Sequence, residues 1–307
     1  MDTRNAVEKS VKINSAGPAN GFTTRLLKGG ALLQDMRQMV CQWSDDLGGE
    51  KALGAANRIL HKSTRVRVAD TLKVAFKPRF IAGNPPDAWK LARVIEDCHP
   101  PIEVVRPFYY WITARAEPIL HRFVTTELFE RTKSADREIR INETTTWVSQ
   151  AAEEESKVWA PTVRQRMARC IHSALRDFGI LEGVIRKRIA PQHLPVEAFC
   201  LIAFCLHELG FEQKSLVRHP DWKLFLLTQT AVERLFLEAH QNGWLDYQCI
   251  GEIYRIEFKS QNLDNYATLF QLRMKPQRGL LVRVASDQSE GGGHWNHHFG
   301  FPKHPFT

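Results

Sequence analysis

The 307-residue sequence contains no long hydrophobic run. Its longest apolar stretch extends from Ala198 to Leu206, and His207 and Glu208 follow it directly. A helix that crosses a lipid bilayer needs about 20 apolar residues, so we expect no membrane-spanning segment. The first residues also lack the apolar segment behind a basic start that a secretory signal peptide requires. Together these two absences predict a cytoplasmic protein.

Patterns typical of metal centres and enzymes are also missing. The six cysteines include no C-x-x-C pair, which argues against a zinc ribbon and against a redox dithiol. The sequence contains no H-E-x-x-H motif, no G-x-S-x-G motif, no phosphate-binding loop and no repeated D-x-D or D-x-E pattern. Lone carboxylates such as Asp70, Glu117 and Asp246 are therefore interpreted as solvated or ion-paired. We expect no enzymatic activity, no cofactor and no bound metal.

One glycine pair invites comparison with phosphate-binding loops. In the segment FTTRLLKGGALLQDMRQMV, residues 22–40, Gly29 and Gly30 stand just before an expected helix. Glycines at such a place can present backbone N–H groups to an anion. A nucleotide loop would also need a Lys-Ser/Thr pair after the last glycine, or a third glycine at the dinucleotide spacing, and an apolar Ala-Leu-Leu run follows instead. We interpret the pair as a hinge before a packed helix.

The composition is that of a globular protein, with 43% hydrophobic and 25% charged residues. In the N-terminal part, apolar residues recur at steps of three and four, which predicts helices at 32–47 and 52–60. A third helix is expected after them, with Ser63 as its N-cap and Pro78 as its end. Its buried stripe is expected to contain Val66, Ala69, Leu72 and Phe76. We predict a mainly α protein that begins with a helical bundle.

A polar segment at 134–161 separates this bundle from a region with a different periodicity. We predict four parts: a flexible leader at 1–21, a helical bundle domain at 22–150, a winged-helix-like domain with short β-hairpins at 151–270, and a flexible Gly/His-rich tail at 271–307. Flexible glycine-rich segments with clustered histidines seldom form one fixed metal site. The histidines of the tail are His294, His297, His298 and His304.

After residue 150 the order of helix, glycine and hairpin occurs twice. In the first copy a helix is expected at 161–178, Gly179 ends it, and a turn at Glu182-Gly183 joins two strands. The apolar face of this helix contains Val163, Met167, Cys170, Ile171, Ala174, Leu175 and Phe178. The opposite, polar face contains Gln165, Arg166, Arg169, His172, Ser173 and Arg176.

The second copy covers residues 228–260. Gly243 follows its helix, and strands are expected around 245–249 and 252–258. Between the two copies, residues 195–211 are apolar almost all round, as expected for a helix at the centre of a domain.

Positive charge is concentrated in the first copy. The net charge of the chain is +8, and residues 161–190 contain seven Lys and Arg against one Asp and one Glu. A basic surplus indicates a polyanionic partner. A helix followed by a basic hairpin is typical of a winged helix-turn-helix, whose helix enters the major groove of DNA while the hairpin lies along the adjacent backbone. We predict DNA contacts by Arg166, Arg169, Ser173, Arg176, Arg186, Lys187 and Arg188. A solvated helix face remains the alternative, because arginine is a good helix former.

A second basic strip occurs in the N-terminal bundle. It consists of Arg58, Lys62, Arg65, Arg67, Lys73, Lys77 and Arg79, against Asp70. From this strip we predict further DNA contacts by Lys62, Arg65 and Arg67. The second copy is acidic, which makes it a poor DNA surface and a better packing or protein-contact element. Its acidic residues are Glu233, Glu238, Asp246, Glu252 and Glu257.

Three segments in this order resemble the BrxA family of bacterial BREX phage-defence islands. They are FTTRLLKGGALLQDMRQMV, NRILHKSTRVRVADTLKVAFKPRF and WAPTVRQRMARCIHSALRDFGIL, and the likeness extends from residue 22 to residue 270. The resemblance implies a non-enzymatic BREX component with a helical N-terminal domain and a winged-helix-like part that binds double-stranded DNA. It also implies other BREX proteins as partners. Two alternatives remain: a protein-interaction adaptor within the defence complex, and an RNA-binding helical-bundle protein.

Overall fold

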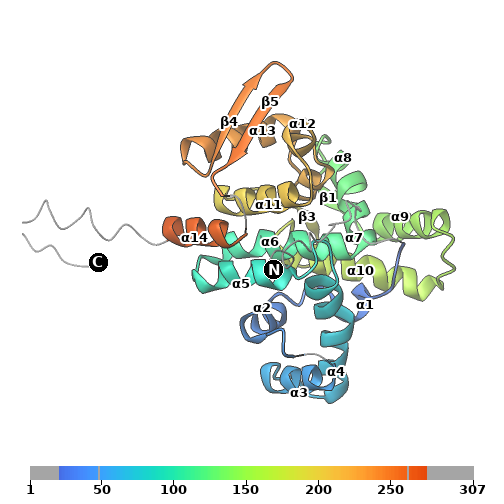
Figure 1. Ribbon diagram of the computed structural model, residues 1–307. Coiled ribbons are helices and arrows are strands. Elements are labelled where there is room, and N and C mark those ends of the chain that lie inside the picture. Colours follow the sequence, from blue (N-terminus) through green and yellow to red (C-terminus); the bar gives the residue numbers. More distant parts are fainter. Residues whose placement is uncertain (1–20, 48, 261–262, 275–307) are drawn as a thin grey trace, which may run out of the picture.

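The computed structural model describes residues 21–47, 49–260 and 263–274. The protein is mainly helical, with two small antiparallel sheets, which confirms the predicted mainly α class (Figure 1). The winged-helix-like character of the C-terminal part stays a prediction. Residues 1–20 of the expected leader and the four tail histidines lie outside the described residues. None of the helices in the described part of the chain is long and apolar enough to cross a bilayer.

Helices form the N-terminal half of the described chain. They are α1 (Leu26–Gly29), α2 (Leu33–Gln42), α3 (Gly49–Ile59), α4 (Arg65–Asp70), η1 (Thr71–Ile81), α5 (Ala88–Asp97), α6 (Ile102–Ala116), α7 (Pro118–Phe123), η2 (Val124–Leu128) and α8 (Phe129–Arg131). Both η1 and η2 are π-helices. The predicted helices at 32–47 and 52–60 correspond to α2 and α3, although α2 ends at Gln42.

Gly29 lies in α1, against η1. A Cβ atom on this residue would lie 3.0 Å from Nη2 of Arg79 and 3.3 Å from Cβ of Ala75. Close packing therefore explains this glycine. Gly30 follows with φ 42°, a left-handed conformation that glycine adopts readily, and connects α1 to α2.

The third predicted helix differs from the prediction at both ends. Its N-cap is Thr64 and not Ser63, because the Thr64 hydroxyl accepts a hydrogen bond from the Arg67 amide at 3.2 Å. Val66 is consequently 70% exposed, and Val68 occupies the buried stripe instead. Pro78 does not end the helix, since the chain continues as η1 to Ile81. The wider π turn accommodates a proline ring that would clash with the preceding turn of an α-helix.

The aromatic helix α6 lies at the centre of the protein (Figure 1). Its Tyr110 ring packs against Phe178 and Phe225, with ring centroids 5.2 and 5.6 Å apart. Residues from both halves of the chain thus belong to one hydrophobic core. The predicted boundary at residue 150 falls inside a helix, α9 (Ile141–Glu154), and the division into two domains stays a prediction.

A three-stranded antiparallel sheet accompanies the helices of the first copy. Its elements are β1 (Glu138–Ile139), α9, α10 (Pro161–Asp177), β2 (Leu181–Glu182) and β3 (Lys187–Ile189). The sheet order is β1-β3-β2, so β3 pairs with a strand on each side. The predicted helix at 161–178 and the hairpin that follows it are confirmed. Strand β1 was not predicted, because it consists of two residues in a polar segment.

The second copy is also confirmed as a helix followed by a hairpin. The elements between the two copies are α11 (Val196–Glu208), α12 (Gln213–Val217) and the 3₁₀ helix η3 (Pro220–Phe225). The second copy itself consists of α13 (Gln229–Gln241), β4 (Leu245–Ile250) and β5 (Ile253–Phe258), and α14 (Leu263–Met274) follows it. Helix α11 has ten buried residues, as its all-round apolar pattern predicts. The β4–β5 hairpin extends from one end of the molecule, and α3 and α4 lie at the opposite end (Figure 1).

Candidate nucleic-acid interface

The outward face of α10 carries the predicted arginines. Arg166, Arg169 and Arg176 are exposed, and Ser173 is half-buried between them. At 100° per residue these four positions span an arc of about 80°, so one ligand surface can meet them all. Arg176 forms an ion pair with Asp177, with 2.8 Å between Nη2 and Oδ1. No carboxylate of the described residues pairs with Arg166 or Arg169.

His172 does not belong to this polar face. Its side chain is buried, and its Nε2 atom lies 2.7 Å from the Thr144 hydroxyl of α9. Burial, with a smaller contribution from the charge of Lys187, lowers the pKa of His172 to about 4. The imidazole is therefore neutral near pH 7 and links α9 to α10. Its position at the edge of the apolar face, between Ala168 and Arg176, explains the error of the prediction, since such an edge position becomes buried when a second helix packs beside it.

The turn of the β2–β3 hairpin depends on Gly183. This residue has φ 91°, and a Cβ atom on it would lie 2.0 Å from the carbonyl oxygen of Arg186. Lys187 supports the turn from within, because its Nζ donates to the carbonyl oxygen of Val184 at 2.9 Å. Arg188 pairs with Glu182 across the two strands, with 2.5 Å between Nε and Oε1. Arg186 is exposed and has no carboxylate partner in the described part of the chain.

A cleft joins the helix to the hairpin. Its volume is about 370 Å³, and it is lined on one side by Arg169, Ser173 and Arg176 of α10. The hairpin contributes Arg186 and Lys187 to the other side. The structure therefore brings together five of the seven contacts predicted for the first copy. The other two lie outside this cleft: Arg166 is further along the exposed face of α10, and Arg188 points to the other side of the hairpin.

A second, wider cleft of about 910 Å³ lies on that other side. Arg188 lines it together with Arg137, which is exposed and directly precedes β1. Sequence reasoning missed Arg137, because it lies in a polar segment that was interpreted as a separator between domains. Its proximity to the hairpin follows from the pairing of β1 with β3, in which Glu138 is opposite Arg188. The hairpin thus has basic side chains next to both clefts.

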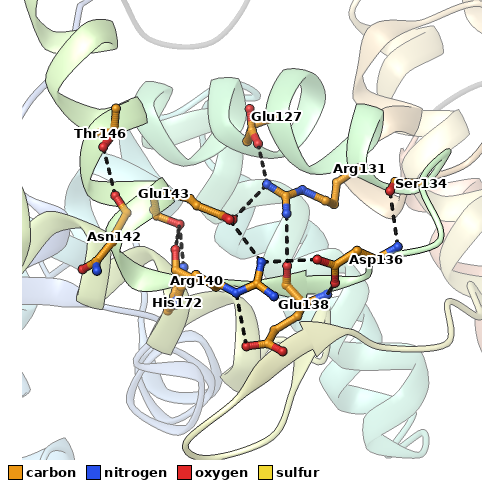
Figure 2. Close-up of polar contacts among 11 residues, drawn as sticks. Glu127, Arg131, Ser134, Asp136, Glu138, Arg140, Asn142, Glu143, Thr146 and His172 are labelled. Carbon is orange, nitrogen blue, oxygen red and sulfur yellow. Dashed lines mark hydrogen bonds and ion pairs between the residues drawn. The ribbon is translucent and has the colours of Figure 1, made fainter.

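Ion pairs fix β1 and the start of α9 beneath these clefts (Figure 2). Arg131 binds Glu143 at 3.0 Å and donates to the backbone carbonyl of Glu138 at 3.2 Å. Arg140 reaches Asp136 and Glu143, each at 3.2 Å. A backbone hydrogen bond from Glu138, together with Arg140, lowers the pKa of Asp136. The carboxylates of this segment are therefore paired with Arg131 and Arg140. They do not form ion pairs with the arginines of α10.

The N-terminal basic strip is less uniform than its sequence indicates. Arg65 and Arg67 are exposed, whereas Lys62 is half-buried and pairs with Asp35 at 2.6 Å. Arg79 is fully buried and pairs with Glu117, with 3.2 Å between Nη2 and Oε1. Arg79 therefore does not contribute to a basic surface. None of these residues lines either cleft beside the hairpin.

Acidic side chains of the second copy are partly engaged by neighbouring residues. Glu233 accepts a hydrogen bond from the Tyr254 hydroxyl at 2.7 Å. Glu252 binds Lys214 at 2.7 Å and Arg218 at 3.0 Å, and these two partners lower its pKa. The described residues contain no group of three or more His, Cys, Asp or Glu side chains that could hold a metal ion.

These features define a mainly helical protein with a basic unit made of a helix and a hairpin. A family model described as BrxA matches residues 20–204, which is more than half of the chain, and the chain belongs to the BrxA family. Family membership implies a role associated with BREX phage defence. The matched range includes the whole basic unit.

The sequence has no match among curated proteins. Among solved structures, the chain is similar to an uncharacterized protein from Magnetospirillum magneticum, with 12% sequence identity and a TM-score of 0.49. That similarity covers 61% of this chain and 95% of the other.

Proposed function

We propose that this chain is a non-enzymatic component of a BREX defence system that binds double-stranded DNA through α10 and the β2–β3 hairpin. The observation that carries the proposal is the cleft in which α10 and the hairpin together present four basic side chains and Ser173. Arg169 and Arg186, one from each element, have no carboxylate partner among the described residues, so both are available to phosphate.

The order of elements supports a winged helix-turn-helix. Strand β1 is followed by α9, α10 and then the hairpin, and β3 pairs with β1 in the same sheet. In such a unit the second helix of the pair reads the major groove, and the hairpin contacts the neighbouring backbone. Helix α10 has 17 residues and is about 25 Å long. The diameter of an α-helix, about 10 to 12 Å, matches the width of a major groove, about 12 Å. Thr144 and His172 hold α9 against α10, and His172 lines the cleft beside Arg169 and Ser173.

The N-terminal strip is proposed as a weaker second contact. Arg65 and Arg67 are exposed and can approach phosphates, whereas Lys62 would first have to leave Asp35. We propose that other BREX proteins bind elsewhere, with the acidic second copy as the candidate contact. A protein that binds bacterial DNA would act in the cytoplasm.

Competition between nucleic acids tests the proposal. A labelled duplex bound to the full chain is challenged with unlabelled duplex, single-stranded DNA and RNA in a gel-shift experiment. We expect the duplex to compete best, because its regular grooves match a rigid helix and hairpin. Preferential competition by RNA would instead support the RNA-binding alternative, and absence of any shift at low salt would support the adaptor.

A further inference from the structure

The turn of the β2–β3 hairpin exposes two branched aliphatic side chains. Val184 is 79% exposed and Ile185 is 95% exposed. The tight turn at Gly183 places both residues at the tip, where they contribute nothing to the hydrophobic core. Isolated exposed aliphatic residues are common in folded proteins, so their exposure alone does not indicate a function. Val184 and Ile185 differ from such isolated residues because Ile185 lines the basic cleft.

The apolar tip is part of the basic cleft. Ile185 lines the same cleft as Arg169 and Arg176 of α10, although most of its surface remains open to solvent. Arg186 follows it directly, and Lys187 is held at the base of the turn by its hydrogen bond to Val184. A ligand that neutralises these arginines would therefore also cover Ile185. That ligand must offer dense negative charge and an apolar surface within a few ångströms of each other.

Double-stranded DNA has both properties, because phosphates flank grooves whose floors are the stacked bases. Proteins that bind the minor groove insert Leu, Ile or Phe side chains between base steps and kink the duplex, with arginine contacts alongside. An isoleucine suits this use because branching at Cβ restricts χ1, so the side chain is held rigid before contact.

We propose that Ile185, supported by Val184, inserts into a groove of the duplex and bends it when α10 and the hairpin bind. This inference rests on the proposed function. It further implies a preference for pyrimidine–purine steps beneath the hairpin tip, since those steps unstack most easily. Arg186 holds the backbone next to the kink, and α10 stays in the adjacent major groove.

The other hairpin of the chain shows what a tip without this environment looks like. Ile250 and Ile253 form a cross-strand pair at the end of β4 and β5, and they are 81% and 77% exposed. The neighbouring charge is Glu252, which binds Lys214 and Arg218. This tip has comparable apolar exposure but an acidic residue in place of free arginine. It provides a matched control within the same protein.

Energy transfer between dyes on the two ends of a duplex tests the proposal. The duplex has about 25 base pairs and a central TA step, and the full chain is added to saturation. We expect the wild-type protein to increase the transfer efficiency, as a bent duplex brings its ends together. Ile185→Ser should abolish most of this increase, while Ile253→Ser should leave it unchanged. The affinity of Ile185→Ser should change by less than about tenfold, because the lost apolar contact is offset by the released cost of unstacking.

The salt dependence of binding separates insertion of Ile185 into DNA from simple phosphate binding. Ile185→Ser removes no charge, so the slope of log affinity against log salt should equal that of the wild type. Binding of the wild type without a change in transfer, or equal bending by Ile185→Ser, would overturn the inference and leave the proposed function intact. Failure of the wild type to bind any duplex would overturn both.

A membrane surface is the competing ligand for an apolar tip with basic neighbours, and a second measurement examines it. Co-sedimentation with vesicles of phosphatidylcholine and phosphatidylserine is compared for the wild type and Ile185→Ser. Vesicle binding that depends on Ile185, together with bending that does not, would assign the tip to a lipid surface instead. Absence of vesicle binding, together with Ile185-dependent bending, supports insertion into DNA.

Discussion

The guanidinium of Arg115 and the carboxylate of Asp221 form an ion pair in the core, where their side chains are 2% and 1% exposed. The same carboxylate accepts hydrogen bonds from Nε1 of Trp111 at 2.7 Å and binds Nε2 of His121 at 2.9 Å. These contacts join α6 and α7 to η3, so they connect the N-terminal bundle to the segment between the two copies. They therefore help to hold together the two halves of the chain that flank the proposed DNA-binding unit.

Removal of the Asp221 carboxylate should destabilise the whole protein. Asp221→Ala leaves the Arg115 guanidinium buried without its ion-pair partner, and a loss of one partner from a buried pair costs about 3 to 5 kcal/mol. We expect this decrease in the free energy of unfolding, measured by urea denaturation. Glu257→Ala, which breaks an exposed pair with Arg255, should have little effect. Equal stability of the Asp221 variant and the wild type would mean that the buried network does not hold the halves together.

Two buried histidines predict a loss of stability on mild acidification. Burial lowers the pKa of His172 to about 4, and burial also lowers the pKa of His219 to about 4 despite the opposing charge of Asp221. Between pH 6.5 and 4 the unfolded chain binds protons that the folded chain does not. Stability is thus fully present above about pH 6.5 and falls as the pH decreases, by about 1.4 kcal/mol per pH unit for each histidine.

His172→Gln tests this pH dependence. Glutamine retains a hydrogen bond to Thr144 but does not titrate, so the dependence should become shallower by the contribution of one histidine. Urea midpoints of the two proteins between pH 7.5 and 4.5 provide the measurement. Parallel curves would show that His172 is not held neutral by its burial.

The salt dependence of duplex binding should report the number of phosphate contacts. If about five basic side chains of α10 and the hairpin contact phosphates, log affinity should fall against log salt with a slope of about −4 to −5. Exposed pairs such as Arg176 with Asp177 exchange readily for phosphate, so they are counted among the contacts. Titrations at several salt concentrations give the slope, and a value near zero would contradict electrostatic binding.

Much of the basic unit follows from sequence because its helix is long and regular. Met167, Ile171 and Leu175 recur at four-residue steps and all are buried, which is what periodicity can predict. Gly179 and Gly243, which follow the helices of the two copies, also allowed both hairpins to be predicted. Both have positive φ, 80° and 70°, a conformation that favours glycine at the end of a helix. The buried central helix α11 was equally evident, because no polar face interrupts its apolar residues.

Tertiary contacts account for what the sequence could not predict. The two-residue strand β1 exists only because β3 offers it a partner, so Arg137 could not be placed next to the hairpin. Arg79 looked like part of a basic surface until Glu117, 38 residues away, paired with it in the core. Pro78 lies within a π-helix, a geometry that local propensity does not indicate. For β1 and Arg79 the deciding partner is distant in sequence.

Truncation of the α10 arginines should strongly weaken duplex binding without unfolding the protein. In the triple variant Arg166→Ala, Arg169→Ala and Arg176→Ala, alanine keeps the helix propensity and the buried face is untouched. Each phosphate contact is worth about eightfold in affinity near 0.1 M salt, so three contacts correspond to about 500-fold. An arginine that reads guanine would add about 1 to 3 kcal/mol of base discrimination.

Two variants of the second copy are the controls for this experiment. Arg234→Ala removes an exposed arginine from α13, and Glu238→Ala removes an exposed acid from the same helix. The first should leave duplex affinity unchanged, and the second should leave it unchanged or raise it slightly. If the triple variant is folded by circular dichroism yet binds as tightly as the wild type, α10 is not the contacting element. Arg65 and Arg67 would then be the next residues to change.

Gly183 and Gly251 allow the shape of the first hairpin to be separated from its charge. Both have positive φ, 91° and 60°, and each lies at the turn of a two-stranded hairpin. A Cβ atom at Gly183 would lie 2.0 Å from a backbone oxygen, whereas nothing lies within 4 Å of one at Gly251. Gly251→Ala should therefore cost only the strain of a left-handed alanine, about 1 to 2 kcal/mol, with duplex binding unchanged.

Gly183→Ala must rebuild the turn, which displaces Arg186 from α10 while every charge remains. We expect weaker duplex binding and a loss of bending in the dye-labelled duplex, with circular dichroism unchanged. Full binding and bending by Gly183→Ala would show that the hairpin acts through its charge alone.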